Sequence, residues 1–167
     1  MDIAPLLHIG PGVTALIGGG GKTTLMDTLA AELRRRGTVI VTTSTHIRRP
    51  ADYPVLTSGD EKAVSAALAR SGAVCVAAES VEGKLTAPAL PFEALSALAD
   101  FVLVEADGAK RLPLKAHAPH EPVIPACARQ TVYVLGVDGF GRPIRQVCHR
   151  PERYAALCGA AQDDPVT

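Results

Sequence analysis

The sequence predicts an α/β protein with three layers, in which a mainly parallel sheet is flanked by helices on both faces. Short apolar, β-branched runs alternate along the chain with Ala- and Leu-rich stretches of helical period. Such alternation produces right-handed crossovers between parallel strands. The runs are almost free of charge, as expected for strands buried on both faces. The length, 167 residues, is that of one domain.

The elements follow from local patterns along the chain. Five apolar runs are expected to be strands, at residues 13–17, 38–42, 73–78, 101–108 and 131–137. A helix is expected to begin at Lys22 and to end with the three arginines that precede Gly37, the expected C-cap. Further helices are expected over 60–70, 91–100 and 151–159. A small hairpin turn is expected around Gly83, and residues 109–129 are expected to form a long Pro-rich loop.

Composition excludes several classes of function. Seventeen basic residues balance seventeen acidic ones, which argues against a nucleic-acid or anionic membrane surface. Aromatic residues are only 4% and Trp is absent, so platforms for stacking bases are not expected. No segment approaches the roughly 18 apolar residues of a membrane span, and the first residues lack the positive region of a signal peptide. The sequence therefore predicts a cytoplasmic protein with chemistry at a local site.

The four cysteines show no C-x-x-C spacing. Without an export signal they are expected to be reduced thiols. A zinc site formed by Cys127, Cys148, His149 and Cys158 is the weaker alternative, since this spacing fits no common zinc pattern.

The strongest functional signal is a glycine run between a strand and a helix. It consists of Gly18, Gly19, Gly20 and Gly21, followed by Lys22, Thr23 and Thr24. Glycine backbones can turn successive N–H groups towards an anion, and a helix N-terminus adds unpaired N–H groups. Lys22 is expected to reach the β- and γ-phosphates, and the Thr23 hydroxyl to bind Mg²⁺.

This run predicts a P-loop NTPase-like fold that binds a nucleotide through its phosphates. The match to G-x-x-x-x-G-K-[ST] is incomplete, because Leu16 stands where the first glycine would fall. The alternative is a flexible Gly-rich turn followed by a chance Lys-Thr pair.

Two carboxylates end the apolar run at residues 101–108. Glu105 and Asp107 alternate by two, so both are expected on the same side of an extended strand. An acid in this place can act on Mg²⁺ as the Walker B aspartate does, while the other orients the attacking water. Asp107 is the predicted metal-side ligand with Thr23, although the residues leave open which acid takes which role. Lys22, Glu105 and Asp107 are the catalytic candidates; solvated acids at a strand end are the alternative.

Several polar residues near these strand ends have two interpretations. Residues 42–46 could sense a γ-phosphate or form a solvated loop. The basic residues could hold an anion or lie scattered on the surface; they are Lys110, Arg111 and Lys115. His117 and His120 are weak metal candidates, and residues 149–152 could contact an anion or cap a helix.

The combination IGGGGKTTLM, VTTSTHI, VLVEADGAKRLPLKA, HEPVIP and HRPE resembles the selenium-dependent molybdenum hydroxylase accessory proteins of the YqeC type. The resemblance covers nearly the whole chain in one order, and the VEADG-x-K-R-L-P-L-K block is its most specific part. It implies a P-loop protein linked to maturation of the selenium or molybdenum cofactor of such hydroxylases.

The resemblance also assigns roles by position. It implies the phosphate-loop role for residues 18–24, the metal-side role for Glu105 or Asp107, and a basic cluster for residues 110, 111 and 115. His117 departs from the family pattern. Family members continue past this point into a base-reading segment, so residues 1–167 are expected to be one P-loop nucleotide-binding domain, the N-terminal portion of a longer domain.

The main functional hypothesis is an Mg²⁺-dependent accessory protein that binds and hydrolyses ATP or GTP. Its expected partners are a molybdenum hydroxylase or the proteins that mature its cofactor, without nucleic acid or membrane. Two alternatives stay open. One is a small-molecule kinase in which Arg111, Lys115 or His120 holds an acceptor; the other is a nucleotide-gated binding module that does not hydrolyse.

Overall fold

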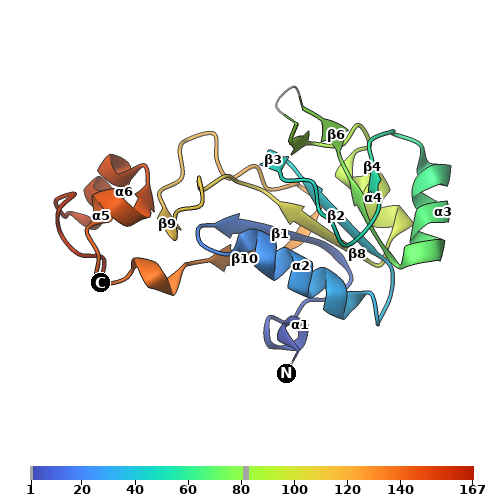
Figure 1. The fold of residues 1–167 in the computed structure, drawn as a ribbon, viewed down its shortest axis with the longest axis horizontal. Coiled ribbons are helices and arrows are strands. Elements are labelled where there is room, and N and C mark those ends of the chain that lie inside the picture. The colour runs from blue at the N-terminus through green and yellow to red at the C-terminus, as the bar shows by residue number, and fades with distance from the viewer. Residues whose placement is uncertain (1, 81–82) are drawn as a thin grey trace.

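A computed structural model of the chain describes residues 2–80 and 83–167. Six parallel strands form its central sheet. They are β1 (Gly12–Gly18), β2 (Val39–Thr43), β4 (Val55–Leu56), β5 (Ala73–Val76), β8 (Phe101–Glu105) and β10 (Ala128–Val134). Their order is β10-β1-β8-β2-β5-β4, so the strands next to β1 and β8 lie far away in the sequence (Figure 1). The predicted α/β class is confirmed.

Helices cover both faces of this sheet. The helices α1 (Ile3–Leu6) and α2 (Lys22–Leu33) pack on one face, and α3 (Glu61–Ser71) and α4 (Phe92–Leu98) on the other. The two-residue period of β8 explains the arrangement, because Leu103 faces α2 whereas Val102 and Val104 face α3 and α4. The layers are therefore those of a P-loop-like fold.

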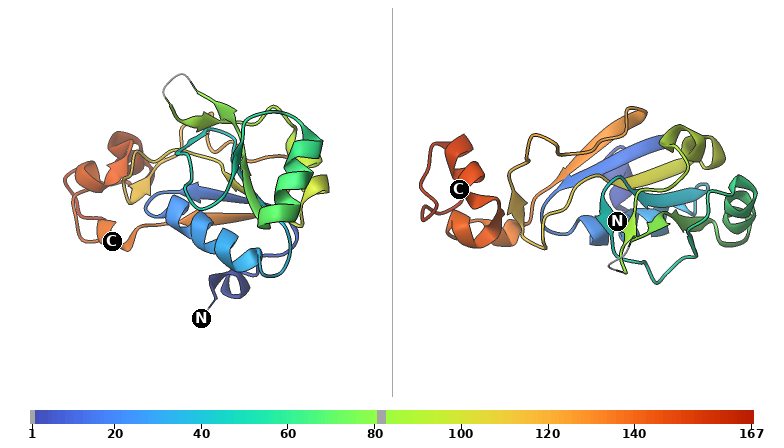
Figure 2. Two further views of the ribbon diagram at one scale, coloured as in Figure 1. Left: turned by 45° about the vertical axis from the view of Figure 1, so that its right-hand side comes forward. Right: turned by 90° about the horizontal axis from the view of Figure 1, so that it is seen from above.

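Short elements extend the fold at the carboxyl end of the sheet. A second sheet contains β3 (His46–Ile47), β7 (Leu85–Thr86) and β6 (Ala78–Glu79). A third pairs β9 (Leu114–Lys115) with β11 (Cys148–His149). The chain also forms a 3-10 turn (Val137–Gly139), α5 (Ile144–Val147) and α6 (Pro151–Cys158). Figures 1 and 2 place α5 and α6 beyond the end of β1 that leads into α2.

Several predicted boundaries differ from the structure. The fifth predicted strand is β10, which begins at Ala128 because it pairs with β1 from Val13 to Gly18. The predicted loop at 109–129 contains β9, and β4 is an additional edge strand paired with β5. Gly83 lies between β6 and β7 as expected of a hairpin, but residues 81–82 lie outside the described residues.

Other boundaries agree closely. The helix predicted over 60–70 begins after Asp60, whose side chain accepts a hydrogen bond from the Lys62 amide at 2.9 Å. It ends at Gly72, which has φ +71°. Among the described helices, none combines the length and apolar character needed to cross a bilayer.

The core predicts a contrast between two leucines in helices. Leu29 of α2 is fully buried, whereas Leu157 of α6 is 71% exposed. We expect Leu29→Ala to lower the free energy of unfolding by about 2–5 kcal/mol, since it leaves a cavity between α2 and the sheet. Leu157→Ala should change it by less than about 0.5 kcal/mol. Urea unfolding of both variants measures the difference, and equal losses would contradict the packing described.

Candidate functional site

Three amides of the glycine run bond to the protein itself. The Gly18 N–H donates to Asp107 Oδ2 at 2.9 Å, Gly19 to the Val134 carbonyl at 2.9 Å, and Gly20 to the Leu112 carbonyl at 3.0 Å. A Cβ on Gly19 would lie 2.5 Å from the Pro113 carbonyl oxygen. Glycines are therefore needed here because other backbone segments approach the loop closely.

The amides available to an anion follow the first three glycines, at the start of α2. The first bond within α2 runs from the Leu25 amide to the Gly21 carbonyl at 2.8 Å, so the amides of residues 22–24 have no partner in the helix. Gly21 precedes them with φ +98°, and a Cβ there would meet nothing within 4 Å. The amides of Gly18, Gly19 and Gly20 are thus engaged within the protein, whereas those of residues 21–24 have no hydrogen-bond partner among the described residues.

Lys22 is buried and turned towards the base of the loop. Its Nζ donates to the Gly18 carbonyl at 2.6 Å and lies 3.0 Å from Asp107 Oδ1, with 6% of the side chain exposed. The approach to Oδ1 is an ion pair without hydrogen-bond geometry, because that buried oxygen has no hydrogen-bond partner among the described residues. The Gly18 carbonyl and the charge of Asp107 therefore hold the Lys22 ammonium close to the N-terminus of α2.

Asp107 is fully buried at the centre of this arrangement. Its Oδ2 lies 2.6 Å from His117 Nε2 and 3.2 Å from Lys115 Nζ, and it also accepts the Gly18 amide. Burial raises the pKa of Asp107, but the Gly18 hydrogen bond and the charge of Lys22 outweigh it and leave the pKa below its ordinary value. Asp107 is therefore ionised at neutral pH and neutralised inside the protein.

A second carboxylate, Glu121, links this centre to α6. Lys115 Nζ lies 2.8 Å from Glu121 Oε2, and Arg150 Nη1 lies 2.7 Å from the same oxygen. Burial raises the pKa of Glu121, but hydrogen bonds from Arg150 and Lys115 outweigh it and lower the pKa to about 2. Since Arg150 immediately precedes α6, this pair of contacts fixes the C-terminal elements beside the loop.

Glu105 faces the hydroxyl of Thr23. On β8, Glu105 follows Leu103 at the two-residue period and therefore shares the face that meets α2. Its Oε2 accepts a hydrogen bond from Thr23 Oγ1 at 3.2 Å. Burial raises the pKa of Glu105, more than the charge of Lys22 lowers it. The predicted pair of acids thus meets the first turn of α2, Glu105 at Thr23 and Asp107 at Lys22.

The polar residues at the end of β2 and directly after it bond to backbone groups. The hydroxyls of Thr42, Thr43 and Ser44 donate to the carbonyls of Val76, Glu105 and Val123. The Thr43 hydroxyl, at 2.8 Å, and the Ser44 amide, at 3.1 Å, both donate to the Glu105 carbonyl. Thr43 and Ser44 therefore position Glu105.

A cleft of about 880 Å³ opens over these groups at the carboxyl end of the sheet, where parallel α/β sheets place their ligands. Gly20, Gly21 and residues 22–24 form one wall. Among the described residues, six Lys or Arg side chains and two carboxylates line the cleft: Lys22, Arg48, Lys84, Lys110, Arg111 and Arg150, with Glu105 and Glu121. The cleft is therefore suited to an anionic ligand.

The basic cluster expected from the sequence is divided. Lys110 and Arg111 line the cleft, whereas Lys115 is buried against Asp107 and Glu121. His120 is exposed and lies outside the cleft lining, but His149 belongs to it. The described residues hold no group of three or more His, Cys, Asp or Glu side chains arranged for a metal, and all four cysteines are unpaired thiols.

Two functional neighbours could not be read from spacing. His117, which the sequence pattern disfavoured, contacts Asp107, and Glu121 links Lys115 to Arg150. Both lie in the Pro-rich segment, where no period relates one residue to another. Only the fold brings them to the loop.

The protein is a P-loop-like α/β protein. Its Gly-rich loop joins β1 to α2 and faces the acidic end of β8 on a parallel sheet. Residues 14–152 match the family model described as "YqeC protein", and the chain belongs to the YqeC family. It is 32% identical over 163 residues to "Uncharacterized protein YqeC" of Escherichia coli (strain K12). That match covers 92% of this chain and 63% of the relative, so the chain spans less than two thirds of its length. No solved structure matches the chain.

The Glu121 network predicts a pH dependence. The pKa of Glu121 is about 2 in the folded protein against an ordinary value of 4.5, so its stabilisation is present above pH 4.5 and is lost as the pH falls towards 2. Glu121→Gln should lower stability at pH 7 and flatten the loss between pH 4.5 and 2, measured by urea unfolding. Glu152→Gln, which removes an exposed carboxylate from α6, should retain the wild-type slope. An unchanged slope in Glu121→Gln would contradict the network.

Proposed function

We propose that the cleft binds the Mg²⁺ complex of a nucleoside triphosphate and that the protein hydrolyses it. The observation that carries the proposal is the hydrogen bond of 3.2 Å from Thr23 Oγ1 to Glu105 Oε2. Thr23 lies in the first turn of α2, directly after β1 and the Gly-rich loop. A hydroxyl from the helix and a carboxylate from a neighbouring strand are the protein ligands of Mg²⁺ in P-loop NTPases.

The residues present fit a triphosphate. The unpaired amides of residues 22–24 and the positive end of α2 provide donors for phosphate oxygens. Lys22 lies beside them and would exchange the Gly18 carbonyl for a phosphate oxygen. Asp107 would then keep its ion pair with Lys115 and its contact with His117, so that the movement of Lys22 leaves no unpaired buried carboxylate.

The residues also fit Mg²⁺. This ion prefers oxygen ligands, takes one or two carboxylates, and completes its shell with water and phosphate oxygens. We assign Glu105 and Thr23 to it, in place of the Asp107 and Thr23 pair that the sequence favoured, because three cationic or imidazole groups enclose Asp107. When bound, Mg²⁺ would neutralise phosphate charge, and a divalent cation beside Glu105 would favour its ionised form.

Hydrolysis would use the same groups. Water attacks the γ-phosphorus and releases inorganic phosphate and the nucleoside diphosphate, while Lys22 and the amides of residues 22–24 stabilise the negative charge of the transition state. We further propose that this reaction serves the maturation of selenium-dependent molybdenum hydroxylases or of their cofactor, in the cytoplasm, with those proteins as partners. Family membership and the resemblance of the VEADGAKRLPLK block support this role.

Nucleotide binding is tested by thermal shift with ATP and GTP, each with and without Mg²⁺. Ligand at 100 times its dissociation constant stabilises a protein by about 2.7 kcal/mol, so the wild-type midpoint should rise with at least one triphosphate. Lys22→Ala should lose that rise and any release of phosphate, because the variant lacks the ammonium that would contact the phosphate oxygens beside the amides of residues 22–24.

Lys62→Ala is the matched control, since Lys62 is exposed on α3. Because Lys22 also neutralises Asp107, the comparison uses the rise caused by ligand and not the midpoint alone. A rise in Lys22→Ala equal to that of the wild type would exclude the assignment.

The assignment of Glu105 predicts how Mg²⁺ affects binding. Glu105→Gln retains an oxygen that can accept from Thr23 but removes the charge that would face the cation. We expect this variant to bind the triphosphate in EDTA at least as tightly as the wild type and to lose most of the gain that Mg²⁺ provides. Isothermal titration in both buffers measures the gain, and the same gain in both proteins would show that Glu105 does not face the metal.

A further inference from the structure

A strained turn places two cations at the edge of the cleft. The Leu112 amide donates to the Ala109 carbonyl at 2.9 Å and closes a turn whose central residues are Lys110, with φ +49°, and Arg111, with φ +63°. Positive φ at both central positions is the pattern of type I′ turns, which favour Asn-Gly. A residue other than glycine is strained in this region, and such strained residues are found most often at functional sites.

The turn is fixed to the phosphate loop. The Gly20 amide donates to the Leu112 carbonyl at 3.0 Å, and the Gly136 amide donates to the Pro113 carbonyl at 2.9 Å. On the other side of the turn, Lys115 Nζ donates to the Gly108 carbonyl at 2.7 Å. The surrounding fold therefore imposes the conformation of the turn and holds its two cations in the same cleft as Gly21 and Thr23.

These cations have no carboxylate partner among the described residues. Lys110 and Arg111, with Arg48 from the segment after β3, line the cleft without an ion pair in the described parts of the chain. The two carboxylates that line the described part of the cleft are already engaged, Glu121 by Lys115 and Arg150, and Glu105 by Thr23.

The surrounding potential is positive. The pKa of His149, which also lines the cleft, is lowered by burial and then by the charges of Arg150, Lys115 and Lys110. A cleft in which charges of one sign prevail concentrates ligands of the other sign.

We propose that Lys110, Arg111 and Arg48 bind the phosphate or carboxylate group of a second small molecule while a triphosphate occupies the amides of residues 21–24. This inference rests on the proposed function for the triphosphate. The amides, Lys22 and the Thr23–Glu105 pair already provide the contacts that a magnesium triphosphate requires, which leaves the three cations for another anion. A volume of about 880 Å³ lies near the upper end of the range for small-molecule sites.

The experiment uses protein saturated with Mg²⁺ and AMP-PNP, a triphosphate analogue that resists hydrolysis. Inorganic phosphate and succinate are the two probes, each titrated by calorimetry at constant ionic strength, so that phosphate and carboxylate recognition are distinguished. At least one probe should bind saturably to the wild type. Lys110→Asn and Arg111→Asn should each weaken that binding by about tenfold or more, the effect of one charged hydrogen bond, with AMP-PNP affinity unchanged.

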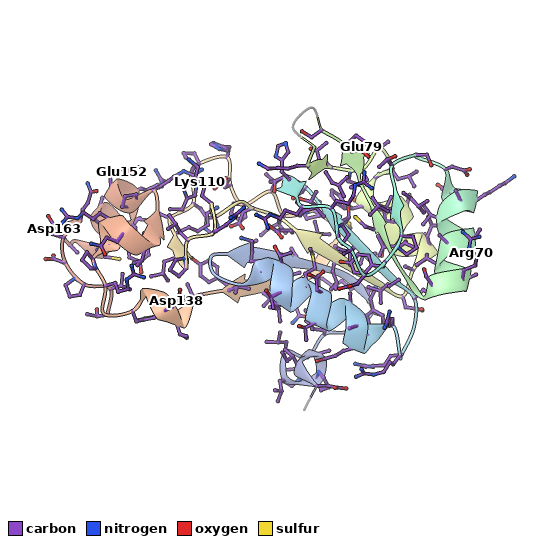
Figure 3. The ribbon with its side chains drawn as sticks, in the orientation of Figure 1. Arg70, Glu79, Lys110, Asp138, Glu152 and Asp163 are labelled. Carbon is purple, nitrogen blue, oxygen red and sulfur yellow. The ribbon has the colours of Figure 1, made fainter. Side chains whose placement is uncertain are left out.

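Asparagine is chosen because it removes the charge and tolerates positive φ. Arg70→Gln on α3 removes one positive charge at the opposite end of the molecule from Lys110 and is the matched control (Figure 3). It should bind the probe as the wild type does.

Three results would overturn the inference. The first is the absence of saturable probe binding to the loaded wild type. The second is probe binding in the two Asn variants that is as tight as in the wild type. The third is a tenfold loss of AMP-PNP affinity in both Asn variants, which would assign the cations to the triphosphate itself. If the wild type binds no AMP-PNP, the proposed function fails separately, and phosphate titration of the free protein decides the inference. Weaker phosphate binding in Lys110→Asn, with unchanged phosphate binding in Lys22→Ala, supports the cation site. Any other pattern of phosphate binding overturns it.

Discussion

The structure of the site depends on one buried ion network, in which the carboxylate of Asp107 is enclosed by Lys22, Lys115 and His117. Removing one partner from a buried charged group typically costs about 3–5 kcal/mol, because the remaining charge is left without compensation. An arrangement of the loop that separated Asp107 from all these partners would therefore be unfavourable. The network also joins Lys22, at the start of α2, to Asp107, Lys115 and His117, which are distant from it in the sequence.

Several features of the cleft follow from this network. Asp107 accepts the Gly18 amide, so the start of the glycine run is fixed before any ligand is present. Lys115 extends the network to Glu121 and Arg150 and thereby places α6 beside the loop. The same lysine holds the Gly108 carbonyl ahead of the Lys110–Arg111 turn. Both cationic regions of the cleft, at Lys22 and at this turn, are thus positioned by the same buried charges.

The sequence predicted what local pattern controls. The alternation of strands and helices predicted the parallel sheet, and the apolar run that ends in Glu105 predicted β8. It did not predict β10 correctly, because pairing with β1 and not local composition determines where that strand begins. The glycine run was expected to bind an anion along its whole length, whereas the structure uses its first three amides internally. His117 and Glu121 lay beyond prediction, because only tertiary contacts bring an irregular segment to Asp107.

The decisive measurement is a crystal structure of the protein with Mg²⁺ and AMP-PNP at millimolar concentration. We expect phosphate oxygens on the amides of residues 21–24 and the ammonium of Lys22 on those oxygens. Asp107 should still accept the Gly18 amide and remain in contact with Lys115. A triphosphate bound elsewhere, or an empty loop under these conditions, would exclude triphosphate binding at this loop.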